Sequence, residues 1–212
     1  MLKKFIAFSL AEVLMVAGIA AVVGAMTIPN MKKSYEKKAR IAKAKTTFAT
    51  LDGAIAQIDN VKVFRGATTT KERSLAMLTA LEDNLQFRYV CGSQPKSEDT
   101  CFKFSNITDT SNTSGSSSTL RINYQCDANG SCATAILKNG AEIAIYRYTA
   151  LKPFISENYD SYFAGYYGFV MVDVDGAKKG PHKRGEDIFV FKITGNGLGY
   201  IKNSIESELL DN

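Results

Sequence analysis

An almost uninterrupted apolar run near the N-terminus constrains this chain more than any other feature. Residues 8–28 contain only three clearly polar side chains, those of Ser9, Glu12 and Thr27. A helix of this length crosses about 30 Å, which is the thickness of the hydrocarbon core of a bilayer. The run therefore predicts a membrane-spanning helix. Its single acid needs an explanation, because a carboxylate in hydrocarbon is costly and usually functional.

A secretory signal peptide is the first alternative, since it too begins with basic residues and an apolar run. Lys3 and Lys4 precede the run in this chain. Three features argue against a signal peptide. The run is long for one, no small-x-small cleavage site follows it, and the chain continues beyond it with a helical pattern.

In that continuation, apolar residues recur at steps of three and four. They are Ile41, Ala44, Phe48, Leu51, Ile55 and Ile58. This spacing places them on one face of a helix that would pack on a globular partner. Pro29 lies between the two patterns. Because proline lacks an amide donor, we expect a kink there.

The segment KKFIAFSLAEVLMVAGIAAVVGAMTIP, residues 3–29, resembles the leader and first helix of type IV pilins and type II secretion pseudopilins. In that superfamily a prepilin peptidase cuts a short basic leader before a phenylalanine, and the new N-terminus is methylated. The resemblance places the cut between Ala7 and Phe8, and it puts Glu12 and Pro29 at family positions. Ala7 departs from the glycine usual at the cleavage site, but both residues are small.

The resemblance implies a role for Glu12 in assembly. Cleavage would create an α-ammonium group on Phe8, and in a packed filament the Glu12 carboxylate of one subunit could meet the Phe8 ammonium of a neighbour. Such a pair would offset much of the cost of burying either charge. The alternative is a protonated or snorkelling glutamate near the membrane edge.

The function that the resemblance implies is that of a structural subunit, a minor pilin or pseudopilin, without enzymatic activity. Its partners would be prepilin peptidase, other pilin or pseudopilin subunits and the bacterial inner membrane. The head would stand outside the cytoplasm, where DNA or secreted cargo is a further candidate partner. The alternative function is that of a signal-anchored extracytoplasmic module that binds or senses a ligand and does not polymerise.

The rest of the chain predicts an α+β head of pilin-like architecture, with the long helix packed on a C-terminal antiparallel sheet. KERSLAMLTALEDNL, after a capping box of Thr69 and Glu72, predicts a short helix. Asn139-Gly140 between alternating runs predicts a hairpin. YGFVMVDV and DIFVFKI predict strands, and LRINYQC is a weaker candidate. Residues 108–119, TDTSNTSGSSST, predict a surface loop.

These patterns divide the chain into four predicted segments. Residues 1–7 are the leader, residues 8–28 are the transmembrane and assembly half of the helix, residues 29–59 are its amphipathic half, and residues 60–212 are the head. The formal net charge of +5 does not indicate a strongly basic nucleic-acid-binding protein.

The four cysteines predict two disulfides in an oxidising compartment. Cys91, Cys101, Cys126 and Cys132 form two local pairs, and their spacing does not fit a zinc site. We expect the pairing 91–101 and 126–132, although three pairings are open from the sequence. Four buried free thiols are the alternative.

Charge counting favours the opposite membrane orientation. Between residues 32 and 45 there are seven basic residues and only one acid, whereas only Lys3 and Lys4 precede the span. Basic flanks usually stay in the cytoplasm. The basic run could contact anionic lipid headgroups, or it could be the solvated face of a helix.

An acidic turn in residues 173–187, DVDGAKKGPHKRGED, is a candidate calcium site. Asp173, Asp175 and Asp187 offer the oxygen ligands that calcium prefers. Type II major pseudopilins, which the N-terminal segment resembles, have a calcium-binding loop near the C-terminal end of the chain, where this turn also lies. The nearby basic residues oppose cation binding, and a polar turn between two strands is the alternative. No cofactor other than calcium is expected.

Overall fold

The computed structural model describes residues 9–59, 63, 70–92, 107–108, 119–120, 132–146, 166–176, 179–201 and 205–210. The chain divides into two units, residues 1–39 and 40–212. The helices are α1 (Leu10–Ala56), α3 (Thr70–Glu82) and α5 (Ile205–Leu210). The strands are β1 (Phe87–Gly92), β2 (Ile107–Thr108), β3 (Thr119–Leu120), β4 (Cys132–Leu137), β5 (Glu142–Tyr146), β6 (Tyr166–Asp173), β7 (Ile188–Thr194) and β8 (Gly197–Gly199).

Helix α1 begins in the first unit, where its large apolar side chains from Leu10 to Met31 are exposed. The helix continues through Pro29, although proline leaves the carbonyl of Ala25 without its usual helical donor. Among the described helices, α1 is the one that is long and apolar enough to cross a membrane. The predicted long helix with an apolar N-terminal half is therefore confirmed.

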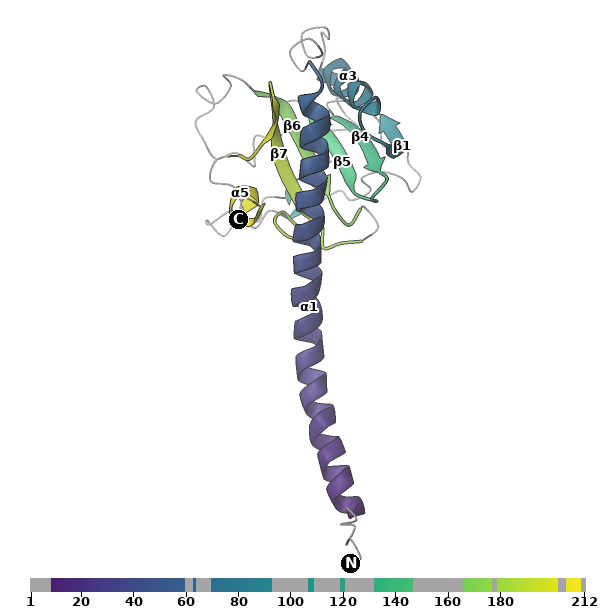
Figure 1. Ribbon diagram of the computed structural model, residues 1–212, viewed down its shortest axis with the longest axis vertical. Coiled ribbons are helices and arrows are strands. Elements are labelled where there is room, and N and C mark those ends of the chain that lie inside the picture. The colour runs from purple at the N-terminus through teal and green to yellow at the C-terminus, as the bar shows by residue number, and fades with distance from the viewer. Residues whose placement is uncertain are drawn as a thin grey trace, which may run out of the picture. The chain divides into compact units, whose positions relative to one another are not determined.

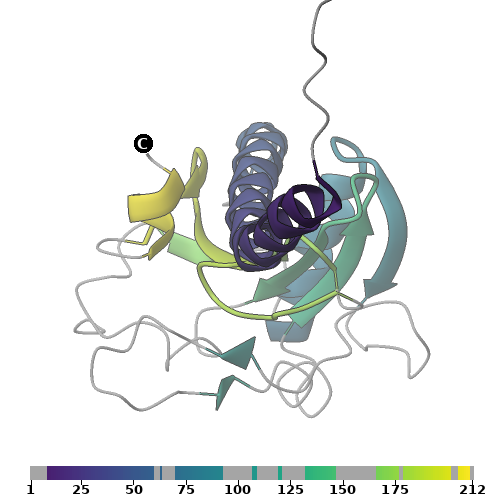
Figure 2. The same ribbon diagram turned by 90° about the horizontal axis from the view of Figure 1, so that it is seen from below.

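The second unit contains a six-stranded antiparallel sheet in the order β1-β4-β5-β6-β7-β8 (Figure 1). From β4 onward each strand pairs with the next one in the chain. Strands β2 and β3 form a separate two-stranded sheet, which Figure 2 shows apart from the larger one. The antiparallel sheet and the helices confirm the predicted α+β class.

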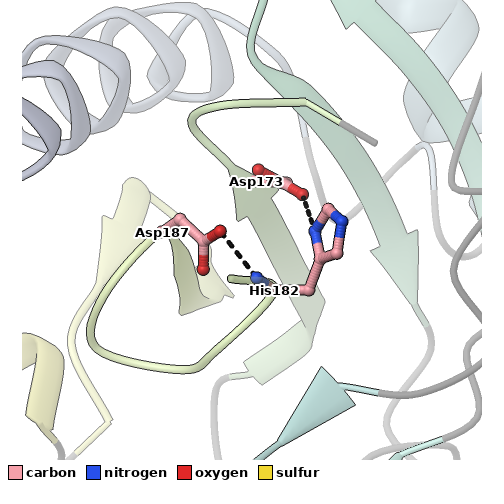
Figure 3. Close-up of side chains that lie close together, drawn as sticks. All are labelled: Asp173, His182 and Asp187. Carbon is pink, nitrogen blue, oxygen red and sulfur yellow. Dashed lines mark hydrogen bonds and ion pairs between the residues drawn. The ribbon is translucent and has the colours of Figure 1, made fainter. Parts of the chain in front are cut away.

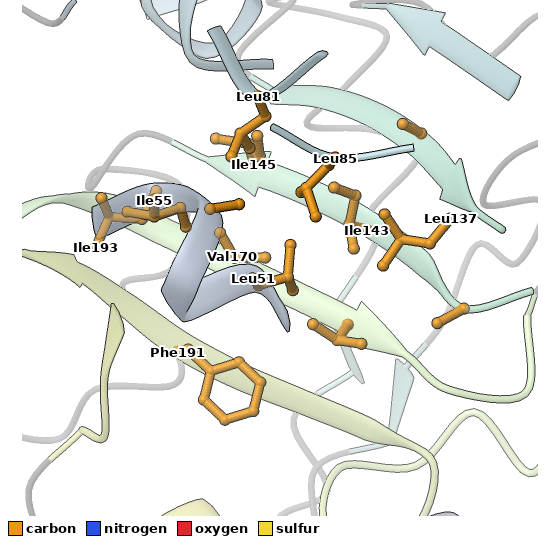
Figure 4. Close-up of a cluster of buried hydrophobic side chains, with 14 of the residues drawn as sticks. Leu51, Ile55, Leu81, Leu85, Leu137, Ile143, Ile145, Val170, Phe191 and Ile193 are labelled. Carbon is orange, nitrogen blue, oxygen red and sulfur yellow. The ribbon is translucent and has the colours of Figure 1, made fainter. Parts of the chain in front are cut away.

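One face of the sheet is covered by the amphipathic part of α1 and by α3. Leu51 and Ile55 of α1 are fully buried near Val170 and Phe191 of the central strands, and Leu81 packs over β5 (Figure 4). Burying side chains of this size contributes roughly 1.5–3 kcal/mol each. All six residues of the predicted stripe are buried or packed against this cluster, which confirms the predicted periodicity.

The predicted hairpin is present as β4 and β5. Gly140 has a φ of 79°, which glycine adopts without strain. The side-chain oxygen of Asn139 accepts the amide of Ala141 at 2.9 Å, and its nitrogen donates to the hydroxyl of Thr47 at 3.0 Å. The asparagine thus closes the turn and ties it to α1 at the same time.

The structure also contains elements that the sequence patterns do not predict. These are β1, β2, β8 and α5. Thr108 and Thr119, the ends of the predicted loop, pair with each other, so the loop prediction was wrong at its two ends. The predicted strand LRINYQC has only Leu120, in β3, among the described residues, and Thr69 of the predicted capping box lies outside them.

Candidate functional site

The start of α1 holds one predicted assembly residue, Glu12, in a capping box. Glu12 Oε2 accepts the backbone amide of Ser9 at 2.8 Å and its hydroxyl at 3.0 Å. The Ser9 oxygen in turn accepts the amide of Glu12 at 3.2 Å. Ser-x-x-Glu is the sequence signature of this box, which satisfies otherwise unpaired helix-start donors. Ala7 and Phe8 lie outside the described residues.

A second polar site forms where β6 ends. Asp173 is the last residue of that strand and is fully buried. Its Oδ1 accepts the amides of Asp175 at 3.0 Å and Gly176 at 2.9 Å, which turns the chain sharply out of the sheet. Gly176 has a φ of 79°, and a side chain there would press on the carbonyl oxygen of Gly140.

Asp187 faces Asp173 from the other end of the same loop (Figure 3). Its two carboxylate oxygens accept the amides of His182 at 2.7 Å and Lys183 at 2.6 Å. His182 has a positive φ of 53°, which is uncommon outside glycine. Its Nδ1 lies 3.2 Å from Asp173 Oδ2, so His182 connects the two ends of the loop, with its ring at Asp173 and its backbone amide at Asp187.

Burial dominates the electrostatics of this pair of acids. Burial, joined by the charges of Asp187 and Glu142, raises the pKa of Asp173 to about 8, even though the backbone amides of Gly176 and Asp175 lower it. Burial also raises the pKa of Asp187, whereas the amides of Lys183 and His182 lower it. Desolvation disfavours the charged form of an acid, and a neighbouring acid adds to the effect.

The three acids predicted to bind calcium are divided between two clusters. Asp173 and Asp187 lie together with His182, and each of the three offers a ligand atom within 4.8 Å of the others. Asp175 is not in that cluster. It accepts Arg40 Nε at 2.7 Å, with both side chains mostly buried.

The described residues of the cluster do not fit calcium well. Calcium takes six to eight oxygen ligands, and a histidine nitrogen replaces one of the predicted oxygens here. The carboxylates of Asp173 and Asp187 already accept four backbone amides between them. The arrangement fits a hydrogen-bonded turn that fixes the loop between β6 and β7. Calcium binding by Asp173, Asp175 and Asp187 is thus an untested prediction from the sequence, and this geometry does not favour it.

Neighbouring elements hold the loop in place. Arg40 and Lys43 of α1 donate to Asp175 and to the carbonyl oxygen of Val174. On the other side, Arg184 binds both carboxylate oxygens of Glu206 in α5, at 2.8 and 2.9 Å. These pairs join residues far apart in the sequence, so no local spacing could have predicted them.

Sequence reasoning also left His182 without a partner, and the structure supplies Asp173. Two of the basic residues that seemed to oppose cation binding are engaged elsewhere. Lys183 pairs with Glu186 at 2.6 Å, and Arg184 is buried against Glu206.

Two of the four cysteines are described, and both are disulfide-bonded. Cys91 lies in β1 and Cys132 begins β4. Cys101 and Cys126 lie outside the described residues, so the pairing 91–101 and 126–132 stays a prediction.

The two candidate sites are thus a capping box at the start of the apolar helix and a buried acid–histidine turn at the end of β6. No family model matches this chain, and neither a curated protein nor a solved structure does.

Proposed function

We propose that this chain is a structural subunit of an extracytoplasmic filament, of the kind formed by type IV pilins and type II secretion pseudopilins. One observation carries the proposal. A single helix, α1, exposes apolar side chains along its first half and supplies the core stripe of an antiparallel sheet domain with its second half. The first half needs lipid or other helices around it, because exposed apolar surface of this extent is unfavourable in water.

The geometry of Glu12 supports an assembly role beyond capping. Both hydrogen bonds from Ser9 end on Oε2, so within the part of the chain that the structure describes Oε1 is available for another donor. In the proposed filament that donor is the Phe8 ammonium of the neighbouring subunit. If each subunit makes this contact with the next one by the same rotation and rise, the contacts do not close into a ring. The subunits then assemble as an open helical filament.

The disulfide-bonded Cys91 and Cys132 support an oxidising compartment for the second unit. The chain would therefore be a single-pass protein of the bacterial inner membrane, with residues 40–212 outside the cytoplasm until assembly. Prepilin peptidase would remove residues 1–7 and methylate Phe8.

The intact mass of the mature chain tests this function. In a bacterial host with an active prepilin peptidase, we expect the membrane fraction to contain a chain that begins at Phe8 and carries one methyl group. Ala7→Gly is the matched control and should be processed at least as fast, whereas the bulky Ala7→Leu should block cleavage. Retention of residues 1–7 in the wild type would refute a pilin-like subunit and favour the signal-anchored binding module.

A further inference from the structure

Seven basic side chains follow the apolar half of α1, and the structure divides them into two sets. Arg40 and Lys43 bind the loop after β6, and Lys45 is half-buried with an interaction of its own. The remaining four are exposed in the first unit; they are Lys32, Lys33, Lys37 and Lys38, and we call them the lysine collar. One acid, Glu36, lies among them, 4.0 Å from Lys32.

The lysine collar surrounds the helix. At about 100° per residue, the four side chains fall at about 0°, 100°, 140° and 240° around the axis, so no face wider than about 120° lacks a positive charge. A protein partner or a DNA duplex would contact one face of the helix. A ring of charge instead matches a surface that encircles the helix, such as the headgroup layer around a membrane span.

The position of the collar along the helix also matches the headgroup layer of a membrane. The apolar stretch from Leu10 to Met31 covers about 33 Å at 1.5 Å per residue, so the collar begins where the hydrocarbon would end. Tyr35 lies within the collar and is 75% exposed. Tyrosine is enriched at membrane–water interfaces because it combines an apolar ring with a polar hydroxyl.

We infer that the lysine collar is a binding surface for anionic phospholipid headgroups, which holds the subunit in the bilayer before it enters a filament. This inference rests on the proposed membrane anchor. Lysines near an anionic membrane surface are attracted to it within a Debye length, so the interaction weakens as salt rises. Extraction into a filament would have to break these contacts.

Energy transfer from a single tryptophan to labelled lipid tests the collar. The chain contains no tryptophan, so Tyr35→Trp gives a unique donor within the collar. The full chain is reconstituted in phosphatidylcholine vesicles with a minor fraction of phosphatidylglycerol. Dansyl-labelled phosphatidylglycerol is the acceptor, and dansyl-labelled phosphatidylcholine is the reference. We expect several-fold enrichment of the anionic acceptor at low salt, with a smaller preference at high salt.

Two collar variants are compared in the same reporter chain. Replacement of all four lysines by glutamine should abolish the preference, whereas replacement of all four by arginine should preserve it because the charge is kept. Equal energy transfer to both labelled lipids in the wild type would overturn the proposed lipid binding by the collar, while the proposed membrane anchor would stand. Binding of duplex DNA without lipid preference would also overturn it. Failure of the full chain to enter these vesicles, with either labelled acceptor, would overturn both the anchor and the collar.

Discussion

Glu12 and Ser9 cap the start of α1 reciprocally, with the carboxylate accepting two hydrogen bonds from Ser9 and the Ser9 hydroxyl accepting the Glu12 amide. This relationship explains part of why an acid stands near the start of an apolar helix. It is compatible with a role in assembly, because removal of residues 1–7 would leave Ser9 and its amide in place. The two roles can therefore be separated by substitution.

The buried acid of the β6–β7 loop predicts a pH-dependent stability. The folded chain raises the pKa of Asp173 to about 8, from an ordinary value of 3.8. The folded state thus binds this proton more tightly than the unfolded state. The stability that this protonated carboxyl group contributes to the folded state is fully present below about pH 4 and is lost as the pH rises through about 8. We expect the free energy of unfolding of the full chain in detergent to fall over this range, by an amount on the order of a few kcal/mol.

Asp173→Asn provides the matched variant, because its amide oxygen can still accept the amides of Asp175 and Gly176 while the charge is lost. Chemical denaturation at several pH values should show a flatter profile and a higher stability than the wild type at pH 8. Asp187 would supply the remaining slope, since burial raises its pKa too. A slope unchanged by Asp173→Asn would show that this acid is not the titrating group.

Calcium should leave the melting temperature of the full chain unchanged at millimolar concentration. The reason is that Asp175 is paired with Arg40, and a histidine completes the cluster of Asp173 and Asp187. Thermal unfolding with calcium and with chelator is the measurement. A rise in melting temperature that Asp187→Asn abolishes would instead establish a cation site, because a bound ligand stabilises by mass action.

Gly197 should not tolerate a side chain. Its φ is 139°, and a Cβ there would fall on Asp52 Oδ1, which accepts the amide of Leu198 at 2.7 Å. We expect Gly197→Ala to destabilise the chain by about 1–3 kcal/mol, combining backbone strain with loss of that contact. Gly199→Ala is the control, because its Cβ would approach the mobile end of the Lys192 side chain, 2.7 Å from Cε, and would meet Thr194 Cγ2 only at an ordinary contact distance of 3.5 Å. Equal effects of the two substitutions in denaturant titrations would contradict this account of the turn.

The buried pair of Arg184 and Glu206 should be costly to break from either side. Both side chains are almost fully buried, and Glu206 also accepts the amide of Val190 at 3.0 Å. Arg184→Met should therefore cost about 3–5 kcal/mol by leaving a buried carboxylate uncompensated. Adding Glu206→Gln should recover part of that loss. A double variant whose loss equals the sum of the single losses would show that the two groups do not interact.

Local patterns in the sequence were sufficient for the elements whose signals lie within one segment. The stripe from Ile41 to Ile58 and the Asn139-Gly140 turn are examples, because helical period and turn chemistry depend only on near neighbours. Strand β1 was missed because its residues alternate poorly, with Arg88, Tyr89 and Val90 all exposed. Helix α5 has only six residues, too few for a clear period.

The candidate sites likewise contain some features that local sequence patterns predict and others that only the tertiary structure reveals. The Ser9–Glu12 box is readable as Ser-x-x-Glu, but the surrounding apolar run gives no helix boundary by which the sequence would mark it as a cap. The partners of Asp175 and Arg184 are more than twenty residues away in the chain, at Arg40 and Glu206. Tertiary structure alone brings such pairs together, so sequence spacing predicted three acids in one site where the fold separates them.

The most direct test of filament assembly is the ratio of sheared filament protein to membrane-retained protein for the wild type, Glu12→Gln and Ser9→Ala. Glutamine can keep the capping box and removes only the charge. Alanine at position 9 removes the hydroxyl, which costs about 1 kcal/mol of helix-start stability, and keeps the charge. We expect Glu12→Gln to lose most filament incorporation, because breaking a buried pair costs about 3–5 kcal/mol, while Ser9→Ala assembles nearly as well as the wild type. Normal assembly of Glu12→Gln would contradict the charge-paired filament, and an equal loss in both variants would reduce Glu12 to a helix cap.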